Sequence, residues 1–154
     1  MRIYIETTVF NRYLEDERGY CEETKQLFER FKAGIDEPFT SAAVIEELER
    51  ADEPKRTNML NLIPQYNINV LEINDTVMEL TKSYIETEII PQNYRYDGIH
   101  IAVAAVNDMD CIVSLNFRHI NKLKTKTGAR IVNLLNGYSS PDICTPMEVI
   151  DNDE

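Results

Sequence analysis

Short apolar runs alternate along this chain with longer stretches that have the spacing of amphipathic helices. Such runs occur at residues 2–5, 69–73 and 111–115, and a shorter one lies near residues 38–40. Runs of this length that are rich in β-branched residues are typical of strands buried in a sheet. Because strands separated by helices pair in parallel and are covered by those helices, the pattern predicts an α/β fold with a parallel sheet buried on both faces.

Capping and breaking residues indicate where the helices of this fold begin and end. A helix at 22–32 places Leu27 and Phe31 at helical spacing and ends near Gly34. The other expected elements are helices near 7–14, from Ser41 through Glu47, between Pro54 and Pro64, at 77–86 after an Asn74 cap and at 98–106, and one more short strand at 129–133.

The length of 154 residues fits one domain with a single core. We expect this domain to span residues 1–150 and the acidic residues 151–154 to form a frayed tail. No apolar run approaches the ~18 residues of a membrane span, and the first residues fit a strand and not a signal sequence. We therefore expect a cytoplasmic protein without a membrane partner.

Several kinds of site are not supported by the sequence. Cys21, Cys111 and Cys144 are widely spaced without a CxxC pair, which argues against a disulfide framework and a zinc cluster and indicates reduced structural thiols. No glycine-rich phosphate loop occurs, and Gly128 and Gly137 are interpreted as turns.

The charge of the chain is unevenly distributed. Its net charge of -11 argues against a general nucleic-acid coat, because nonspecific affinity comes mostly from Lys and Arg side chains on phosphates. Residues 111–141, however, contain no Asp or Glu and carry the basic side chains Arg118, Lys122, Lys124, Lys126 and Arg130. This basic segment is either a solvated charged face or a local positive field that attracts an anionic ligand.

Three acidic residues that are far apart in the sequence are expected to face one crevice of this fold. Glu6 follows the strand at 2–5, and open α/β sheets bind their ligands at the carboxyl ends of strands. Glu47 lies on a helix whose apolar residues face inward, and Asp97 is an N-cap or first-turn residue of the helix at 98–106. Taken singly, Glu47 also fits a solvated helix face and Asp97 a simple cap.

Carboxylates gathered in this way require a compensating cation. Three of them about 5 Å apart would repel by roughly 3 kcal/mol per pair at an effective dielectric constant of about 20. Mg²⁺ and Mn²⁺ are the obvious candidates, because both are hard cations that prefer oxygen ligands and retain waters or phosphate oxygens. Such a site indicates metal-assisted hydrolysis of a phosphodiester.

Four segments of the chain combine these residues with characteristic neighbours. They read IYIETTVF at 3–10, SAAVIEEL at 41–48, YDGIHIAVA at 96–104 and VSLNFRHI at 113–120. In order and spacing they resemble the motifs of the PIN-domain nuclease family, whose third motif is usually Asp-Ala-Leu-His-Leu-Ala and whose fourth usually ends in Asp-Phe-Lys-His. Each segment is a weak signal by itself, whereas four in order are fairly specific.

The resemblance implies a three-layer α/β/α sandwich with a central, mainly parallel sheet. It also implies a ribonuclease that cuts RNA with one or two Mg²⁺ or Mn²⁺ ions. Many relatives are toxins that pair with an antitoxin protein, and homodimers are common among them. The family's metal-ligand positions correspond to Glu6, Glu47, Asp97 and Asn116, and its active-site hydroxyl corresponds to Thr8.

Other residues near these motifs are candidates for contacts with RNA. The candidates in the basic segment are Arg118, His119, Lys122, Lys124 and Lys126. His100 lies in an apolar helix and is interpreted as a hydrogen-bonded core histidine. Tyr94 and Tyr96 fit ordinary packing at the helix entrance somewhat better than stacking on a base.

Two positions depart from the family pattern. Glu6 stands where Asp is usual and extends the carboxylate by about 1.5 Å, and Asn116 replaces a second Asp and removes one negative charge. The alternative function is therefore a catalytically weakened or inactive PIN-fold module that binds RNA or a protein partner. A phosphatase of another α/β class ranks last, because no Asp-x-Asp motif follows the first strand.

Overall fold

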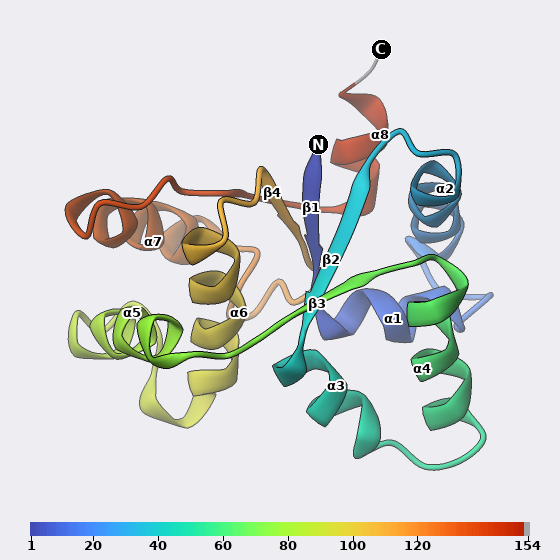
Figure 1. Cartoon of the computed structure of the whole chain (residues 1–154), viewed down its shortest axis with the longest axis horizontal. Coiled ribbons are helices and arrows are strands. Elements are labelled where there is room, and N and C mark those ends of the chain that lie inside the picture. The colour runs from blue at the N-terminus through green and yellow to red at the C-terminus, as the bar shows by residue number, and fades with distance from the viewer. Residues whose placement is uncertain (153–154) are drawn as a thin grey trace.

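Among residues 1–152, which the computed structural model describes, five short strands form one sheet in which all neighbours are parallel. In spatial order the strands are β3 (Asn69–Leu71), β2 (Glu37–Ser41), β1 (Arg2–Ile5), β4 (Cys111–Val113) and β5 (Asp142–Cys144). The sheet runs through the middle of the molecule in Figure 1. Its order confirms the predicted α/β fold, with the first strand of the sequence at the centre.

Helices form the two outer layers of a three-layer α/β/α sandwich (Figure 1). One layer contains α5 (Asp75–Glu86), α6 (Arg95–Val106) and α7 (Leu123–Leu135). The other contains α1 (Thr7–Tyr13), α2 (Cys21–Lys32), α4 (Lys55–Gln65) and α8 (Pro146–Asp151). The helix α3 (Ala42–Glu49) contacts α1, α4 and α6, and a short 3-10 helix, η1 (Gln92–Tyr94), leads into α6. The predicted three-layer sandwich is confirmed.

The middle of the sheet and the helix α6 are the most buried parts of the fold. Ile3 and Ile5 of β1 and Ile112 and Val113 of β4 have no exposed surface. Residues 98–105 of α6 are all buried, as expected for a helix that is apolar on all sides. The elements that carry Glu6 and Asp97 are therefore held in the core, which fixes the positions of both residues.

The segment after β4 differs from the structure expected from the sequence. The predicted strand at 129–133 is wrong, because these residues belong to α7. Thr125, Ala129 and Val132 are buried at spacings of four and three residues, so the inward face of this segment follows a helical period. That period outweighs the local β propensity of Ile131 and Val132. The fifth strand is β5, whose three residues are too few to give a recognisable strand pattern.

Gly128 lies inside α7 and not in the predicted turn, so that interpretation is wrong. A Cβ atom at this position would lie 2.7 Å from Cγ1 of Ile89, so any larger residue would require the Ile89 side chain to move. Gly137, which follows the C-cap of α7, has φ 82° and lies in a turn as predicted. Between α5 and α7, the Tyr84 hydroxyl donates to Asn133 Oδ1.

The other expected elements are present with shifted ends. The strands predicted at 69–73 and 111–115 end at Leu71 and Val113. Of the predicted frayed tail, Asp151 ends α8, and residues 153–154 lie outside the described part of the chain. The three cysteines are free thiols. No helix within residues 1–152 is long and apolar enough to cross a membrane.

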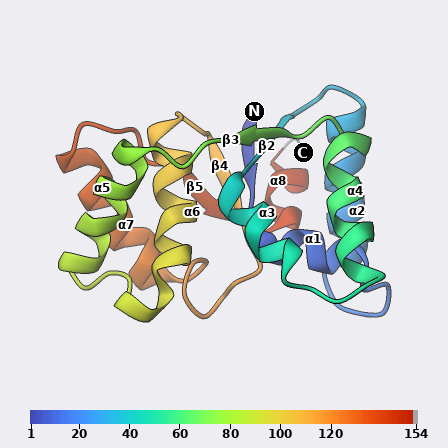
Figure 2. The same cartoon turned by 60° about the horizontal axis from the view of Figure 1, so that its bottom comes forward.

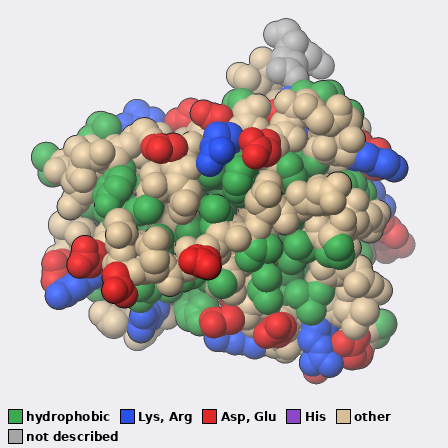
Figure 3. All heavy atoms as spheres, viewed as in Figure 1, with side chains coloured by type: hydrophobic (Ala, Val, Ile, Leu, Met, Phe, Trp, Pro, Cys, Tyr) green, Lys and Arg blue, Asp and Glu red, His purple; other side chains and the backbone are tan. Residues whose placement is uncertain are grey.

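Charged side chains are spread thinly over the face of the molecule that Figure 1 presents. Figure 3 shows hydrophobic side chains across the middle of this face and acidic and basic ones mostly toward its border. The edge strand β3 contributes Val70, which is 44% exposed.

Candidate active site

The carboxyl ends of β1, β2 and β4 meet at one edge of the sheet. Tyr4 of β1 pairs with Phe39 of β2, and Ile5 of β1 pairs with Val113 of β4, so the residues that follow these strands start from neighbouring positions. Figure 2 turns this edge forward and shows α3 between α1 and α6. The predicted site residues Glu6, Glu47, Asp97 and Asn116 lie on these helices or directly beside these strand ends.

Glu6 is the N-cap of α1, and its carboxylate is engaged within the protein. Its Oε2 accepts a hydrogen bond from Thr8 N at 2.6 Å, and its Oε1 accepts from Thr8 Oγ1 at 3.0 Å and from Ser114 Oγ at 2.8 Å. The residue is 2% exposed. Burial raises the pKa of Glu6, although the charge of His100 and these hydrogen bonds act in the opposite direction. Glu6 therefore ties the start of α1 to the end of β4.

Thr8, the predicted active-site hydroxyl, takes part in the same network. Its Oγ1 donates to Glu6 and accepts from Leu115 N at 2.9 Å. The first hydrogen bond lies within the start of α1, whereas the second links α1 to the segment that follows β4. The hydroxyl group thus helps to hold the two sides of the site together.

A chain of hydrogen bonds runs from Glu47 into the core through a buried histidine. His100 Nε2 lies 2.5 Å from Glu47 Oε1, which also accepts from Thr7 Oγ1 at 2.9 Å. On the other side of the ring, His100 Nδ1 lies 2.7 Å from the Tyr4 hydroxyl, which is 2.8 Å from Ser41 Oγ. His100 is 1% exposed, in agreement with the predicted core histidine, whereas the Glu47 side chain is 26% exposed.

The charges of all three predicted carboxylates act on the His100 ring. Burial lowers the pKa of His100, but the hydrogen bond and charge of Glu47 and the charges of Glu6 and Asp97 outweigh burial and raise the pKa above its usual value. Burial raises the pKa of Glu47, and there the hydrogen bond and charge of His100 prevail and lower it. Both shifts favour an imidazolium paired with a carboxylate. His100 is therefore a group within the protein that can carry positive charge beside the three acids.

Asp97 lies in the first turn of α6 and contacts the turn after β4. Its Oδ1 accepts from Asn116 Nδ2 at 3.3 Å. Burial raises the pKa of Asp97 to about 6, with the charge of His100 lowering it and that of Glu47 raising it. Asn116 Oδ1 accepts from His119 N at 3.0 Å, which shapes the turn. The structure thus brings Asp97 together with Asn116 and with the Glu47–His100 pair.

The basic candidates for RNA contacts fall into two groups. Arg118, His119 and Lys122 lie between β4 and α7, and burial and the charges of the other two lower the pKa of His119. Lys124 and Lys126 lie in the first turn of α7, where Lys126 lines a cavity of about 280 Å³ beside β5. The first group adjoins the turn that contacts Asp97, whereas Lys126 faces β5.

Comparison with protein-family models agrees with this geometry. The model described as PIN domain matches residues 3–126. The chain belongs to the PIN-domain family. The matched part runs from β1 into α7 and contains all four predicted metal-ligand positions of the PIN domain, so the family resemblance is confirmed.

Two solved structures share the PIN fold of this chain. The structure of VapBC2 from Rickettsia felis bound to a DNA fragment from their promoter has a TM-score of 0.59 at 13% identity, covering 79% of this chain and 94% of that chain. Mycobacterium tuberculosis VapC20, described as a Sarcin-Ricin loop cleaving toxin, has a TM-score of 0.52 at 13% identity, covering 76% and 92%. At this identity the likeness establishes the fold alone. Comparison with curated proteins finds no match.

A divalent ion in this PIN domain would need carboxylate oxygens that are not already engaged. Within residues 1–152, no group of three or more His, Cys, Asp or Glu side chains is arranged to hold a metal ion. Glu47 and Asp97 are partly exposed, and no hydrogen bond within the described residues reaches Glu47 Oε2 or Asp97 Oδ2. Mg²⁺ often binds through one or two carboxylates and keeps several waters. Glu47 and Asp97 each keep an oxygen for such an ion, whereas the three hydrogen bonds of Glu6 make it a poorer direct ligand.

Two residues that contact the site were not identified from the sequence. Ser114 Oγ donates to Glu6 and accepts from Asn116 N at 3.0 Å. Ser114 is a polar residue directly after a buried strand, and the same pattern identified Glu6, so the sequence could have pointed to it. Tyr4 holds His100 through its hydroxyl, and nothing in the sequence distinguishes Tyr4 from an ordinary core aromatic.

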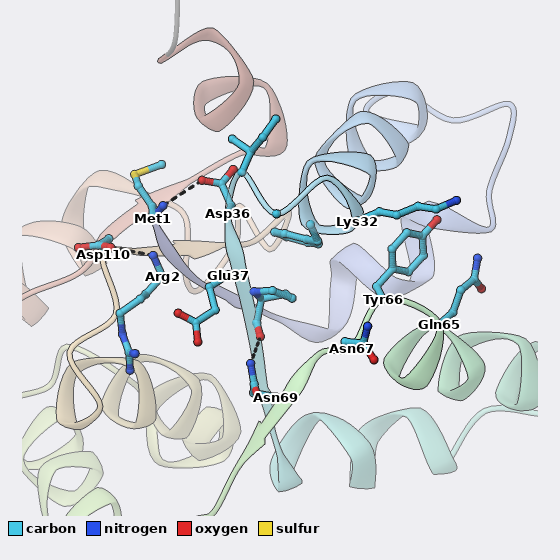
Figure 4. Close-up of a pocket in the computed structure, with 14 residues that line it drawn as sticks. Met1, Arg2, Lys32, Asp36, Glu37, Gln65, Tyr66, Asn67, Asn69 and Asp110 are labelled. Atoms are coloured by element: carbon cyan, nitrogen blue, oxygen red, sulfur yellow. Dashed lines mark hydrogen bonds and ion pairs between the residues drawn. The ribbon is translucent and has the colours of Figure 1, made fainter.

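A separate cavity of about 510 Å³ lies at the amino ends of β1, β2 and β3, on the opposite side of the sheet from the predicted site (Figure 4). Two of the charged groups in its wall are engaged: the Met1 ammonium lies 3.1 Å from Asp36 Oδ1, and Asp110 Oδ2 accepts from the backbone N of Arg2 at 2.7 Å. None of the four predicted metal-ligand residues lines it. Size alone therefore does not locate the active site of this PIN domain.

Proposed function

We propose that this PIN domain is a metal-dependent ribonuclease that hydrolyses RNA phosphodiester bonds and acts as the toxin of a toxin–antitoxin pair. The observation that carries the proposal is the placement of Asp97, a partly exposed carboxylate in the first turn of α6, beside Asn116 and the Glu47–His100 pair. Membership of the PIN-domain family supports nuclease activity. The likeness to VapC20, a Sarcin-Ricin loop cleaving toxin, supports RNA as the substrate class.

Glu47 and Asp97 would hold Mg²⁺ or Mn²⁺, and Asn116 and Glu6 are the other candidates from the motif positions. When bound, such an ion neutralises charge on the phosphate and makes a water molecule a better nucleophile at neutral pH. Asn116 contributes an amide hydrogen bond that orients Asp97. Glu6 keeps the ends of β1 and β4 in register with each other through Thr8 and Ser114.

The residues behind Glu47 fix its position before a ligand binds. His100 holds Oε1 of Glu47 and leaves Oε2 without a partner among the described residues. The Tyr4 hydroxyl holds the other side of the imidazole ring. A carboxylate that is fixed in this way loses little conformational freedom when it binds a cation.

Arg118 and Lys122 are the candidates for contacts with the RNA backbone. Both side chains are exposed, and both belong to the segment without acidic residues that adjoins Asn116. Contacts from such residues to phosphate oxygens position a nucleic acid without reading its sequence. An antitoxin would inhibit the enzyme by covering the same edge of the sheet, with a basic side chain placed among the carboxylates.

The test is cleavage of a single-stranded RNA by the purified protein in Mg²⁺, Mn²⁺ or EDTA. We expect cleavage only with a divalent ion and its loss in Asp97→Asn. Glu46→Gln is the matched control, because Glu46 is the exposed neighbour of Glu47 and contacts the Tyr96 hydroxyl instead of His100. Cleavage that persists in EDTA, or that survives in Asp97→Asn, contradicts the proposal.

A noncatalytic PIN module that binds RNA or a protein partner is the second candidate. The engaged carboxylate of Glu6 and the positive charge of His100 among the acids favour it. Calorimetry with Mn²⁺ separates the two candidates. Ion binding that is lost in Asp97→Asn supports the enzyme, whereas RNA binding without any ion binding supports the module.

A further inference from the structure

Two pairs of aromatic rings are built on the turn that follows Asn116. Phe117 pairs with Tyr20, with ring centroids 5.9 Å apart and planes 43° apart. His119 stacks on Tyr94, with centroids 3.8 Å apart and planes 26° apart. Tyr20 precedes α2 and Tyr94 ends η1, so the turn draws ring partners from two distant parts of the chain.

These rings are accessible to solvent. Phe117 is 47% exposed, Tyr94 is 41% exposed and Tyr20 is 37% exposed. Single exposed apolar residues are common on proteins and need no explanation. Here, however, the rings occur in two pairs, one built on Phe117 and one on the partly buried His119, with the exposed Arg118 between these two residues.

The turn that carries the rings is held firmly by hydrogen bonds. The Asn116 carbonyl accepts from Ile120 N at 3.1 Å and from Asn121 N at 2.8 Å. Asn121 Nδ2 donates to the Ser114 carbonyl at 3.0 Å, and Thr125 Oγ1 donates to the His119 carbonyl at 2.9 Å. The rings therefore occupy defined positions and lose little freedom when a ligand contacts them.

The turn is also anchored to the site and placed in the basic part of the chain. Asn116, which begins it, donates to Asp97 at 3.3 Å. Arg118 and Lys122 are exposed on a segment without acidic residues, although the chain as a whole has a net charge of -11. A ligand that matches both features has flat aromatic groups joined by negative charges, which is the chemistry of an unpaired nucleic-acid strand.

We propose that the Tyr94–His119 and Tyr20–Phe117 pairs are stacking platforms for unpaired bases of a single-stranded nucleic acid whose backbone is held by Arg118 and Lys122. The inference rests on the proposed function in that it concerns the substrate of the same site. It goes further, because it assigns base contacts to four residues other than the acids Glu6, Glu47 and Asp97. The platforms select for bases that are free to leave a stack, and they do not read sequence, since every base has an aromatic face.

The experiment measures binding and not cleavage, in EDTA, by fluorescence anisotropy. The probes are a labelled single-stranded oligonucleotide of about ten nucleotides, as RNA and as DNA, and a strand of the same length whose central nucleotides lack bases. The protein variants are Tyr94→Leu and Phe117→Leu, with Tyr94→Phe as the conservative variant that keeps the ring. Leu135→Ala is the matched control, because Leu135 is an 81% exposed apolar residue at the far end of α7.

We expect each Leu variant to bind the base-containing strands about tenfold or more weakly, as is typical for loss of one base–aromatic stack. Binding of the baseless strand should be unchanged, because the phosphate contacts remain. Tyr94→Phe and Leu135→Ala should bind like the unmodified protein. If the Leu variants bind normally, or weaken the baseless strand equally, the rings serve a protein contact or no ligand, and the proposal is overturned.

Fluorescence of a tryptophan variant tests the Phe117 platform independently of the folding of the Leu variants. The chain has no tryptophan, so Phe117→Trp introduces a single indole on one platform. We expect its fluorescence to be quenched by the base-containing strands and not by the baseless strand. Quenching in protein that does not cleave RNA would refute the nuclease and leave the platforms in place, whereas cleavage without quenching would refute the platform built on Phe117.

Discussion

His100 Nε2 lies 2.5 Å from Glu47 Oε1 across the interface between α6 and α3, in a part of the site where the histidine is 1% exposed. This contact joins two helices that are separate in the sequence. It also places a group that can carry positive charge among acids that would otherwise repel each other. The pair is therefore a structural feature of the site as well as a candidate part of its chemistry.

Glu47→Gln should destabilise the protein by about 1–3 kcal/mol near pH 6, because it removes the counter-charge of a buried imidazolium. The pKa of His100 is raised, so its stabilisation is complete below the unfolded value of about 6.5 and is lost as pH rises through the folded pKa. The pKa of Glu47 is lowered, so its stabilisation is present above about pH 4.3 and is lost as pH falls through the folded pKa. Urea unfolding at about pH 6 and about pH 9 checks this prediction. The loss of stability in Glu47→Gln should be smaller at the higher pH, where the stabilisation by protonated His100 declines. An effect that is equal at both pH values, or equal to that of Glu46→Gln, contradicts it.

Asp97→Asn should make the protein more stable at neutral pH, at the expense of its proposed function. The pKa of Asp97 is raised to about 6 by burial, so ionising this group costs stability as pH rises from about 4 through about 6. Because the carboxylate is partly exposed, solvent screening reduces the effect, and we expect a gain of about 1–2 kcal/mol at pH 7.5. Unfolding curves of both proteins at pH 7.5 and at about pH 3 measure this gain. It should vanish near pH 3, which lies below both the unfolded pKa of about 3.9 and the folded pKa of about 6.

The affinity for Mn²⁺ should rise between about pH 5 and about pH 7.5, because protons compete with the ion at Asp97. The pKa of about 6 sets the middle of this window, and the affinity should level off above it. Calorimetric titration at several pH values tests the expectation. An affinity that does not change over this range would show that Asp97 is not a ligand.

Glu6→Gln should change the affinity for Mn²⁺ by less than about threefold if the carboxylate acts through Thr8 and Ser114 and not as a ligand. Glutamine keeps the length of the side chain, and the hydroxyl groups of Thr8 and Ser114 can rotate to accept from its amide. Glu6→Ala, by contrast, should cost about 1–3 kcal/mol of stability through loss of the N-cap and its partners. A loss of ion binding in Glu6→Gln with normal stability would instead establish Glu6 as a ligand, which is its predicted role.

Gly128→Ala should destabilise the protein by about 1–3 kcal/mol. In an isolated helix this change would stabilise by about 1 kcal/mol. Here the added Cβ would lie 2.7 Å from Cγ1 and 3.0 Å from Cδ1 of Ile89, so the side chain of Ile89 would have to move. Thermal unfolding measures the change. In a protein that already carries Ile89→Ala, the further change Gly128→Ala should cost much less stability, because the clashing side chain is gone. If Gly128→Ala is stabilising, α7 does not pack as described.

The sequence determined the class of fold and the edge at which the polar residues gather. Strands such as β1 and β4 are apolar runs bounded by polar residues, and their burial depends on local composition that can be recognised residue by residue. For the same reason Glu6 and Asp97 could be assigned to a strand end and a helix start. The strand at 129–133 failed because the burial of α7 is decided by contacts with α5, which outweigh local propensity.

Only the tertiary structure decided which atoms of these residues are free and which are engaged. The contact between His100 and Glu47 spans 53 positions of the sequence, and that between Ser114 and Glu6 spans 108. The direction and length of such hydrogen bonds depend on how the layers pack, and local sequence carries no information about them. The burial of His100 among the acids, the engaged oxygens of Glu6 and the aromatic pairs at Phe117 and His119 arise from the packing of distant segments against one another.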